Sequence, residues 1–440
     1  MANTYLSFTT GSAGNRAKWT WSGWVKKTDL TANGTLFFAG GSNSDYSKIL
    51  LQSSGTIYIS EVGGSSTIWE VQTNRKFRDP SAYYHMVFVY DSAQSTASNR
   101  LKIYINGVQE TSFSTATYPN QNATDNINLA GNTQYIGGAA SSQYFNGVMS
   151  HIIYCDNYAY DASSFGETDS TTGEWKINTS PSVTYGTNGF YLLKDGNSLT
   201  DQSGNSNNFT LGGGTLTNTE DCPSNVFATV NAMAPATGNL TSLKYGNLEL
   251  KQQNNPYAWP VTLCGHTGKW YWEQKVSALG TTAVGILKQD KFPQKDSVFY
   301  PFAQATGYAY KNTGNKGNNN NDSSYGNSYT SGDILSVAFD QTNGTIWFGK
   351  NGTWQNNATD AQIAAGTTTY AAFSSMPTNE EFYGPFIYAD GSTEVASNFG
   401  NGYFGITAVS SAGTNASANG IFEYDVPAGF TALSTKGLNL

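Results

Sequence analysis

The sequence has few charged residues, no closely spaced cysteines and no long apolar run. Asp, Glu, Lys and Arg make up only 12% of its 440 residues, about half of their usual share. The three cysteines, Cys155, Cys222 and Cys264, are far apart and lack the paired spacing of a zinc or redox site. No apolar stretch approaches the ~18 residues that cross a bilayer, and the first residues lack the basic and apolar regions of a secretory signal. We therefore expect cytosolic synthesis without a signal peptide and no membrane insertion.

The charged residues that are present do not cluster. The net charge is −8 and the pI is near 4.9, and Lys and Arg form no run or stripe. A nucleic-acid-binding protein needs clustered basic side chains to displace the counterions of the phosphates. We therefore expect no nucleic-acid partner.

What the sequence has in abundance is typical of β-sheet. It contains 47 Gly, 28 Tyr, 23 Phe and 10 Trp. Aromatic residues suit pleated, half-buried surfaces, and Gly and Asn supply the turns between strands. A chain of this length usually forms two domains.

Strand patterns recur through the first 165 residues. Lys18-Trp-Thr-Trp-Ser-Gly-Trp24 alternates, which places Trp19 and Trp21 on one strand face, as expected of core residues. Tyr84-His-Met-Val-Phe-Val-Tyr90 is a nearly continuous apolar run, typical of a central strand. Leu101-Lys-Ile-Tyr-Ile-Asn-Gly107 alternates and ends on Asn-Gly, the strongest short hairpin signal.

The strand patterns stop at Gly166 and resume in the second half of the chain. Residues 166–236 are rich in Thr, Ser, Asn, Gly and Pro, yet Trp175, Tyr191 and Leu192 recur too often for disorder. The second half repeats short strands, with Asn-Gly turns at 343–344 and 351–352. The sequence therefore predicts an all-β chain of two antiparallel β-sandwich (jelly-roll) domains, at 1–165 and 237–440. An ordered polar connector, 166–236, joins them and packs on the first domain.

Several motifs resemble known families. The order of Tyr84–Asp91, Leu101–Gly107 and Phe145–Ile152 is similar to the laminin-G-like, concanavalin-A-type jelly-roll family over residues 1–165. Gly268-Lys-Trp-Tyr-Trp-Glu273, the hairpin from Gly332 to Gly352, and Asn398-Phe-Gly400 resemble the SPRY (B30.2-like) family.

The junction between the halves resembles another group of proteins. Asp201-Gln-Ser-Gly-Asn-Ser-Asn-Asn-Phe209 and Asp221-Cys-Pro-Ser-Asn-Val-Phe-Ala-Thr-Val-Asn231 are similar to the junction in virion proteins of marine bacteriophages, and so is the C-terminal Pro427–Leu433. That resemblance implies a location on the virion surface, reached by assembly in the host cytoplasm and release by lysis.

An enzyme is one alternative, because concanavalin-type jelly rolls include glycoside hydrolases. Those need two carboxylates across a sugar. The best acidic cluster, Glu167–Glu174, lies among Thr and Gly without apolar alternation, and this pattern favours a solvated loop. His85, His151 and His266 are far apart in sequence, so no catalytic constellation is predicted.

Calcium is a candidate cofactor. Asp195, Asn197, Asp201 and Asn205 place hard oxygen donors in one Gly-rich region, and calcium prefers such ligands. Asx-turns explain the same residues without a metal, and both interpretations stay open.

Glycan binding is the third candidate chemistry. Sugars stack on aromatic rings and exchange hydrogen bonds with amides. The polar loop from Lys311 to Tyr329 contains Asn320, Tyr325 and Tyr329, and Trp354 follows a hairpin turn. In the alternative interpretation, the tyrosines hold the loop onto the sandwich.

These observations together predict a non-enzymatic, lectin-like bacteriophage surface protein, tail-fibre-like or capsid-associated, that mediates host attachment or contacts within the virion. Its expected partners are a cell-surface glycan and other virion proteins. A purely structural virion subunit and a carbohydrate-active enzyme are the alternatives. The sequence contains no heptads, and homo-oligomerisation stays open.

Overall fold

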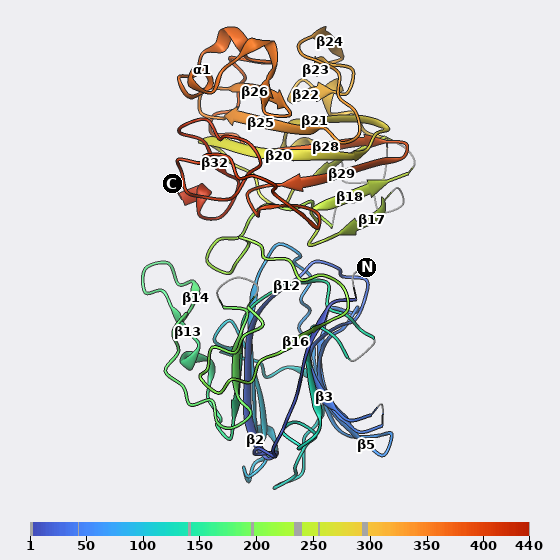
Figure 1. Ribbon diagram of the computed structural model, residues 1–440, viewed down its shortest axis with the longest axis vertical. Coiled ribbons are helices and arrows are strands. Elements are labelled where there is room, and N and C mark those ends of the chain that lie inside the picture. Colours follow the sequence, from blue (N-terminus) through green and yellow to red (C-terminus); the bar gives the residue numbers. More distant parts are fainter. Residues whose placement is uncertain are drawn as a thin grey trace. The chain divides into compact units, whose positions relative to one another are not determined.

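The chain folds into two compact units that consist almost entirely of β-strands (Figure 1). The computed structural model describes residues 3–42, 44–139, 142–194, 198–232, 240–253, 256–292 and 298–439. The first unit comprises residues 1–218 and 222–224, and the second comprises 219–221 and 225–440. In the described residues the one α-helix is α1 (Asp360–Ala364), and no helix there is long and apolar enough to cross a bilayer.

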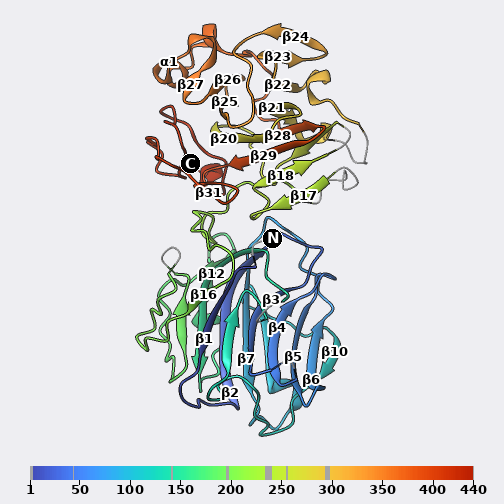
Figure 2. The same ribbon diagram turned by 45° about the vertical axis from the view of Figure 1, so that its right-hand side comes forward.

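The first unit is a sandwich of an eight-stranded and a six-stranded sheet. In spatial order the larger sheet contains β10 (Phe113–Thr117), β6 (Ser66–Thr73), β5 (Ile57–Gly63), β4 (Tyr46–Leu51), β3 (Gly34–Gly40), β11 (Thr133–Ile136), β1 (Tyr5–Thr9) and β16 (Thr210–Gly212). The smaller contains β15 (Phe190–Leu192), β12 (Gly147–Asp156), β2 (Lys18–Lys27), β7 (Tyr84–Asp91), β8 (Leu101–Ile105) and β9 (Val108–Gln109). Figure 2 shows β3 to β6 side by side.

Alternating side chains form the core between these sheets. Trp19 and Trp21 of β2 are fully buried in it, which confirms their predicted place. Ile57 and Ile59 of β5 face them from the opposite sheet and are at most 2% exposed. Because successive side chains of a strand point to opposite faces, each core-forming strand also supplies an outer face.

The second unit is a sandwich of the same kind. In spatial order its larger sheet contains β17 (Leu240–Lys244), β18 (Glu249–Gln252), β29 (Thr393–Asn398), β20 (Lys269–Ala278), β25 (Ile334–Asp340), β26 (Thr345–Lys350) and β27 (Thr353–Trp354), with β32 (Thr431–Ala432) parallel to β20. The facing sheet contains β19 (Tyr257–Pro260), β28 (Tyr383–Asp390), β21 (Thr281–Lys288), β22 (Gly307–Lys311), β23 (Asn315–Asn318) and β24 (Asn321–Ser324). A separate two-stranded pair, β30 (Tyr403–Phe404) and β31 (Thr407–Ala408), also belongs to this unit. The antiparallel sheets confirm the predicted fold class.

Two of the Asn-Gly turns have the backbone that tight hairpins require. φ is +48° and +80° at Asn106 and Gly107, and +49° and +76° at Asn351 and Gly352. Positive φ at both central residues is the type I′ pattern, which matches the twist of the flanking strands. At Gly107 a Cβ atom would also lie 2.4 Å from the ring of Trp175, so this turn needs glycine for both reasons.

The segment after residue 165 covers the outer face of the six-stranded sheet. The hairpin β13 (Gly166–Thr168)–β14 (Trp175–Ile177) and the following chain supply Trp175, Val183 and Tyr191, which pack on Val87 and Ile153. β15 and β16 then extend both sheets of the first unit. Residues 166–218 thus belong to the first unit, whereas the chain from Asn225 onward belongs to the second.

A buried histidine holds this covering segment in place. His85 of β7 is fully buried, and its ring stacks between Trp24, at 4.8 Å, and Trp175, at 5.9 Å. The Trp175 indole N–H donates to His85 Nδ1 at 2.9 Å. A neutral ring therefore carries its proton on Nε2, which donates to Ser22 Oγ at 2.9 Å.

Acid should loosen this contact. Burial lowers the pKa of His85 from 6.5 to about 3. Between these values only the unfolded chain binds the proton, so the free energy of unfolding of the first unit should fall as the pH drops below 6.5. We expect weaker amide protection in β7 and β14 at pH 4.5 than at pH 7, measured by hydrogen exchange corrected for intrinsic rates.

The matched control is His85→Gln, which removes the titrating group. That variant should lose this part of the pH dependence. An equal slope in both proteins would show that His85 does not control the acid response.

Candidate functional site

The outer face of the eight-stranded sheet carries a row of aromatic side chains. On β4, Ser47 and Ile49 point into the sandwich, so Tyr46 and Lys48 point outward. The same alternation turns outward Tyr5, Phe38, Tyr58 and Tyr135. Tyr144, from the segment before β12, stacks on Tyr5. We call these six rings the tyrosine face: Tyr5, Phe38, Tyr46, Tyr58, Tyr135 and Tyr144.

Five of these rings touch in sequence across the sheet. Tyr144 stacks on Tyr5 with centroids 6.1 Å apart, and Tyr5 meets Tyr135 at 5.7 Å. Tyr135 meets Phe38 at 5.8 Å, and Phe38 stacks on Tyr46 at 5.1 Å. From β1 to β5 the row crosses four strand spacings, about 19 Å. An extended ligand could contact several rings at once.

Lys48 joins the last two rings of the row. Its ammonium lies 5.2 Å from the Tyr46 centroid and 5.5 Å from that of Tyr58, within the range of cation–π attraction. The Tyr58 hydroxyl donates to Glu70 Oε2 at 2.7 Å, which fixes that ring. Burial lowers the pKa of Lys48 and is the largest cause of the rise in the pKa of Tyr58 to about 12.

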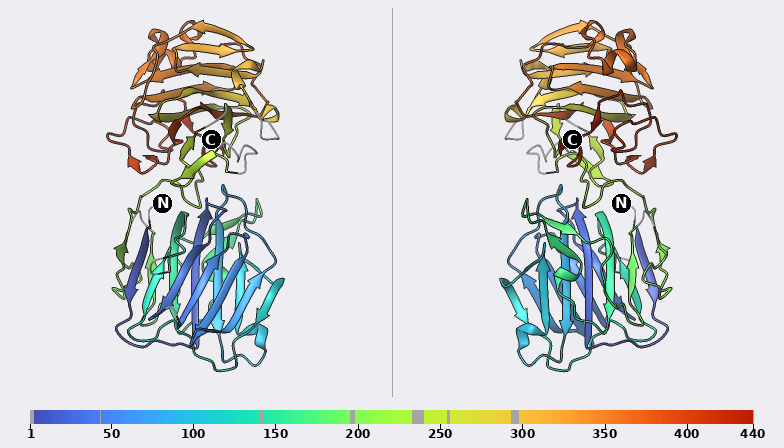
Figure 3. Two further views of the ribbon diagram at one scale, coloured as in Figure 1. Left: turned by 90° about the vertical axis from the view of Figure 1, so that its right-hand side faces the viewer. Right: turned by 90° about the vertical axis from the view of Figure 1, so that its left-hand side faces the viewer.

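Nothing in the described part of the first unit covers this face. The left view of Figure 3 looks onto the eight-stranded sheet, and no other ribbon of that unit crosses it. The outer face of the six-stranded sheet, by contrast, is covered by residues 166–191. Among the described residues of the first unit, the tyrosine face is therefore an aromatic surface that no other segment of that unit covers.

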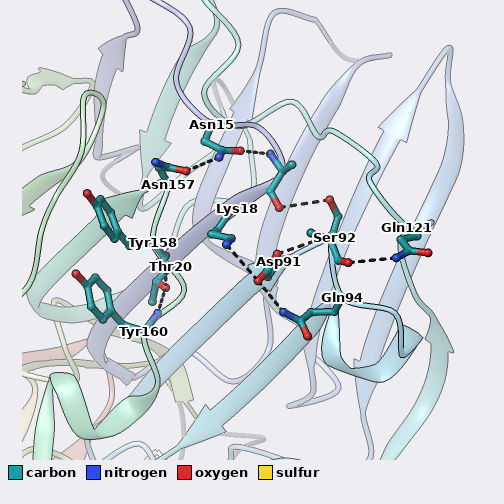
Figure 4. Close-up of polar contacts among 12 residues, drawn as sticks. Asn15, Lys18, Thr20, Asp91, Ser92, Gln94, Gln121, Asn157, Tyr158 and Tyr160 are labelled. Carbon is teal, nitrogen blue, oxygen red and sulfur yellow. Dashed lines mark hydrogen bonds and ion pairs between the residues drawn. The ribbon is translucent and has the colours of Figure 1, made fainter.

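A second aromatic and polar surface lies near the start of β2 (Figure 4). Tyr158 and Tyr160 stack there at 5.7 Å. Lys18 pairs with Asp91 at 3.5 Å, and Asp91 also accepts a hydrogen bond from Gln94 at 2.9 Å. These groups bond mainly to one another, so this surface ties the strand ends together and offers fewer free groups than the tyrosine face.

The structure corrects the predicted glycan-binding tyrosines. Tyr325 and Tyr329 are 8% and 3% exposed and belong to the core of the second unit. The Tyr329 hydroxyl donates to the carbonyl of Thr282 at 2.9 Å, and the Tyr325 hydroxyl accepts from the backbone N–H of Phe348 at 3.3 Å. Both side chains hold the loop onto the sandwich, as in the alternative interpretation, and neither ring face is open to a sugar.

The other two predicted glycan-binding residues lie in different surroundings: Trp354 is buried and Asn320 is exposed. Trp354 is 9% exposed, packs with Tyr271, and donates its indole N–H to Asp360 at 2.8 Å. Asn320 is exposed at the turn between β23 and β24, where its φ is +60°. The four predicted residues therefore do not form one aromatic surface.

The described part of the predicted calcium site is occupied by protein hydrogen bonds. The Asp201 carboxylate accepts from the backbone N–H groups of Tyr191, Ser203 and Asn207 and from the Ser203 hydroxyl, at 2.7 to 2.9 Å. Asn205 donates to the carbonyls of Gly186 and Gly189. The bond from the Ser203 N–H is an Asx-turn contact, and others join Asp201 and Asn205 to more distant backbone. Because these bonds already engage both side chains, Asp201 and Asn205 do not fit calcium. Asp195 and Asn197 lie outside the described residues.

Several carboxylates of the first unit are held by contacts within the protein. Glu61 and Asp125 are 4% and 0% exposed and accept from the indoles of Trp69 and Trp19, and burial raises the pKa of both acids. Of Glu167–Glu174, which the sequence predicts to be a solvated loop, residues 169–174 form the largely exposed turn of the β13–β14 hairpin, and Glu167 and Thr168 end the strand before it. Asp169 accepts from backbone N–H groups of this turn and pairs with Lys176. Glu61, Asp125 and Asp169 therefore serve contacts within the protein.

Glu273 is the acid of the second unit whose environment most resembles that of a catalytic group. Burial raises its pKa to about 7, and such values are common at active sites. It nevertheless accepts from the backbone N–H groups of Glu423 and Tyr424 and from the Tyr271 hydroxyl, each at 2.9 Å. Glu273 therefore anchors the C-terminal segment.

The second unit also contains a cleft of about 700 Å³. His266 and Lys269 line it together with Phe382, Phe430 and Leu438. Phe382 and Leu438 are 56% and 40% exposed, while Lys269 already pairs with Asp340 at 3.4 Å. This cleft is largely apolar and suits a hydrophobic side chain better than a sugar.

Family models match both halves. Residues 1–154 match the concanavalin A-like lectin/glucanases superfamily, and residues 269–401 match the SPRY domain. The family models thus show a laminin-G-like domain at residues 1–154, followed by a SPRY domain at residues 269–401. Both predicted resemblances are confirmed.

Solved structures and curated proteins add little to these matches. The SPRY domain of human HERC1 is 17% identical over 34% of this chain and 87% of its own, with a TM-score of 0.27. A pentraxin of Limulus polyphemus is 17% identical over 36% and 72%, with a TM-score of 0.28. The CBM40 of a Ruminococcus gnavus sialidase, bound to sialyllactose, is 16% identical over 31% and 73%, with a TM-score of 0.24. No curated protein matches the chain.

The tyrosine face of the laminin-G-like domain was not predicted from the sequence. Its signal was present in short alternating stretches such as Tyr46-Ser-Lys-Ile-Leu-Leu51, where outward aromatic or charged residues alternate with apolar ones. The strand order that aligns these stretches is not readable from spacing. Tyr135 and Phe38 are neighbours only because β11 pairs with β3.

The raised pKa of Glu273 gives the SPRY domain a pH response opposite to that of His85. Between pH 4.5 and 7 the native state binds the proton and the unfolded state releases it, so stability should fall as the pH rises through this window, by about 3 kcal/mol. We expect this loss in the hydrogen exchange of β20 and β29. Glu273→Gln should remove the pH dependence, and an unchanged slope in that variant would contradict the assignment.

Proposed function

We propose that this protein is a non-enzymatic surface protein of a bacteriophage virion, tail-fibre-like or capsid-associated, that binds a host-cell glycan through its laminin-G-like domain. The observation that carries the proposal is the tyrosine face. It offers ring faces for the apolar sides of sugars, beside hydroxyl and amide groups for their hydroxyls.

The polar residues of the face support a sugar ligand over an apolar protein partner. Ser7 of β1 and Thr133 of β11 lie on the same face as the rings of these strands. Gln72 of β6 is opposite Tyr58 of β5. All three are only half-buried or partly exposed. A surface of rings interspersed with hydroxyls and amides matches the mixed apolar and polar character of a saccharide.

The virion location is proposed from the junction motifs. Asp201–Phe209 and Asp221–Asn231 resemble the junction of phage virion proteins. In the structure, Asp201 of the first motif bonds within the connector, to the backbone N–H groups of Tyr191 and Asn207, and Tyr191 lies in β15, which extends a sheet of the first unit. The SPRY domain would then supply contacts to neighbouring virion proteins, for which its apolar cleft with Phe382 and Leu438 is suited.

Removing one ring from the middle or the end of the row should weaken glycan binding. We expect Tyr135→Ala and Tyr58→Ala each to reduce affinity about fivefold, because stacking contacts contribute about 1 kcal/mol each. A glycan array probed with the intact chain, with calcium and again with EDTA, would identify the ligand. Titration of that ligand would then measure the loss.

The matched control is Tyr300→Ala, which removes a tyrosine that is 42% exposed in the SPRY domain. It should leave glycan affinity unchanged. A folded protein that binds no glycan in either condition would contradict the proposal and favour the structural-subunit alternative.

A further inference from the structure

The tyrosine face contains a single positive charge. The eight strands of its sheet include three charged residues, Lys48, Glu61 and Glu70. Glu61 points into the core, where it accepts from the Trp69 indole, so Lys48 and Glu70 are the charges on the outer face. Against a chain with a net charge of −8, this cation stands out.

Lys48 has no acidic partner among the described residues. Its surroundings are the rings of Tyr46 and Tyr58, and burial is the cause of its altered pKa, with no neighbouring charge contributing. Glu70, the acid on the same face, instead accepts from the Tyr58 hydroxyl. Ring faces compensate a half-buried ammonium only in part, so the site favours an incoming anion.

The register of the strands fixes how such an anion would lie. Lys48 is opposite Ser60, and Ser60 is opposite Glu70, which places the two charges two strand spacings apart, about 10 Å. On the other side, Lys48 is opposite Phe38, and Phe38 is opposite Tyr135. An anionic group that approaches from the Phe38 side meets Lys48 while staying away from Glu70.

We propose that the ligand of the tyrosine face is an acidic glycan and that Lys48 recognises its carboxylate or sulfate group. This inference rests on the proposed glycan-binding function and adds the class of ligand. The half-buried rings of Tyr46 and Tyr135 take the neighbouring sugar units, while Phe38, which is only 7% exposed, supports these two rings from between them. The ammonium of Lys48 supplies the selectivity for charge.

The test compares ligands that differ in charge. Binding of the full chain to polygalacturonate, to a sulfated galactan and to an uncharged galactan is measured at 50 mM and 500 mM salt by biolayer interferometry. We expect binding to at least one acidic polymer to be at least tenfold tighter than to the uncharged one, and to weaken at high salt because the charge contact is screened.

Variants separate the role of Lys48 from that of the rings. Lys48→Gln should lose at least tenfold in affinity for the acidic polymer, and Lys48→Arg should retain most of it. Lys102→Gln removes an equal charge from the half-buried Lys102 of β8, on the other sheet, and should change affinity less than threefold. Tyr135→Ala should weaken binding to every polymer that the protein recognises.

The outcomes distinguish this inference from the proposed function. Equal binding to charged and uncharged polymers, or full acidic binding by a folded Lys48→Gln variant, would overturn the inference while glycan binding stands. Binding to no glycan of any charge, from a folded protein, would overturn both.

Discussion

The two-residue period of the β-strand is the constraint on which this protein depends. Each strand that buries one set of side chains between the sheets must present the other set outside. In the laminin-G-like domain, one of the two outer faces is covered by a later segment of the chain and the other is not. The outer face of the six-stranded sheet is apolar and is covered by residues 166–191. The outer face of the eight-stranded sheet carries rings, hydroxyls and one lysine, and no described segment covers it.

Much of the fold could be predicted because its signals are local. Alternation placed Trp19 and Trp21 in the core, and Asn-Gly marked hairpins whose backbone has the required positive φ. The proposed binding surface was harder to predict, because strand pairing decides whether an aromatic side chain joins a row of rings on the surface. Tyr325 and Tyr329 lie in a polar loop yet enter the core, while Tyr135 belongs to the tyrosine face only through pairing with β3.

The polar motifs of the connector illustrate the same difficulty. The predicted calcium ligands Asp195, Asn197, Asp201 and Asn205 have the composition of a cation site, but hydrogen bonds within the protein engage Asp201 and Asn205, the two that the structure describes. A chain with few charges must satisfy many buried N–H and C=O groups with Asn, Asp and Ser side chains. Such residues are therefore weak indicators of metal binding here, even when their spacing is suggestive.

The pairing of distant strands has a consequence for how the chain is made. β1 begins at Tyr5, yet one of its two neighbours is β16, which ends at Gly212. During translation, which adds about 5–20 residues per second, the N-terminal strand waits roughly ten seconds or more for that partner. Throughout this interval one edge of the larger sheet stays open to other nascent chains. Copies of the chain emerge close together on a polysome, and these strands carry few charges that would oppose pairing between copies. A chaperone that shields the open edge would therefore matter most during this interval.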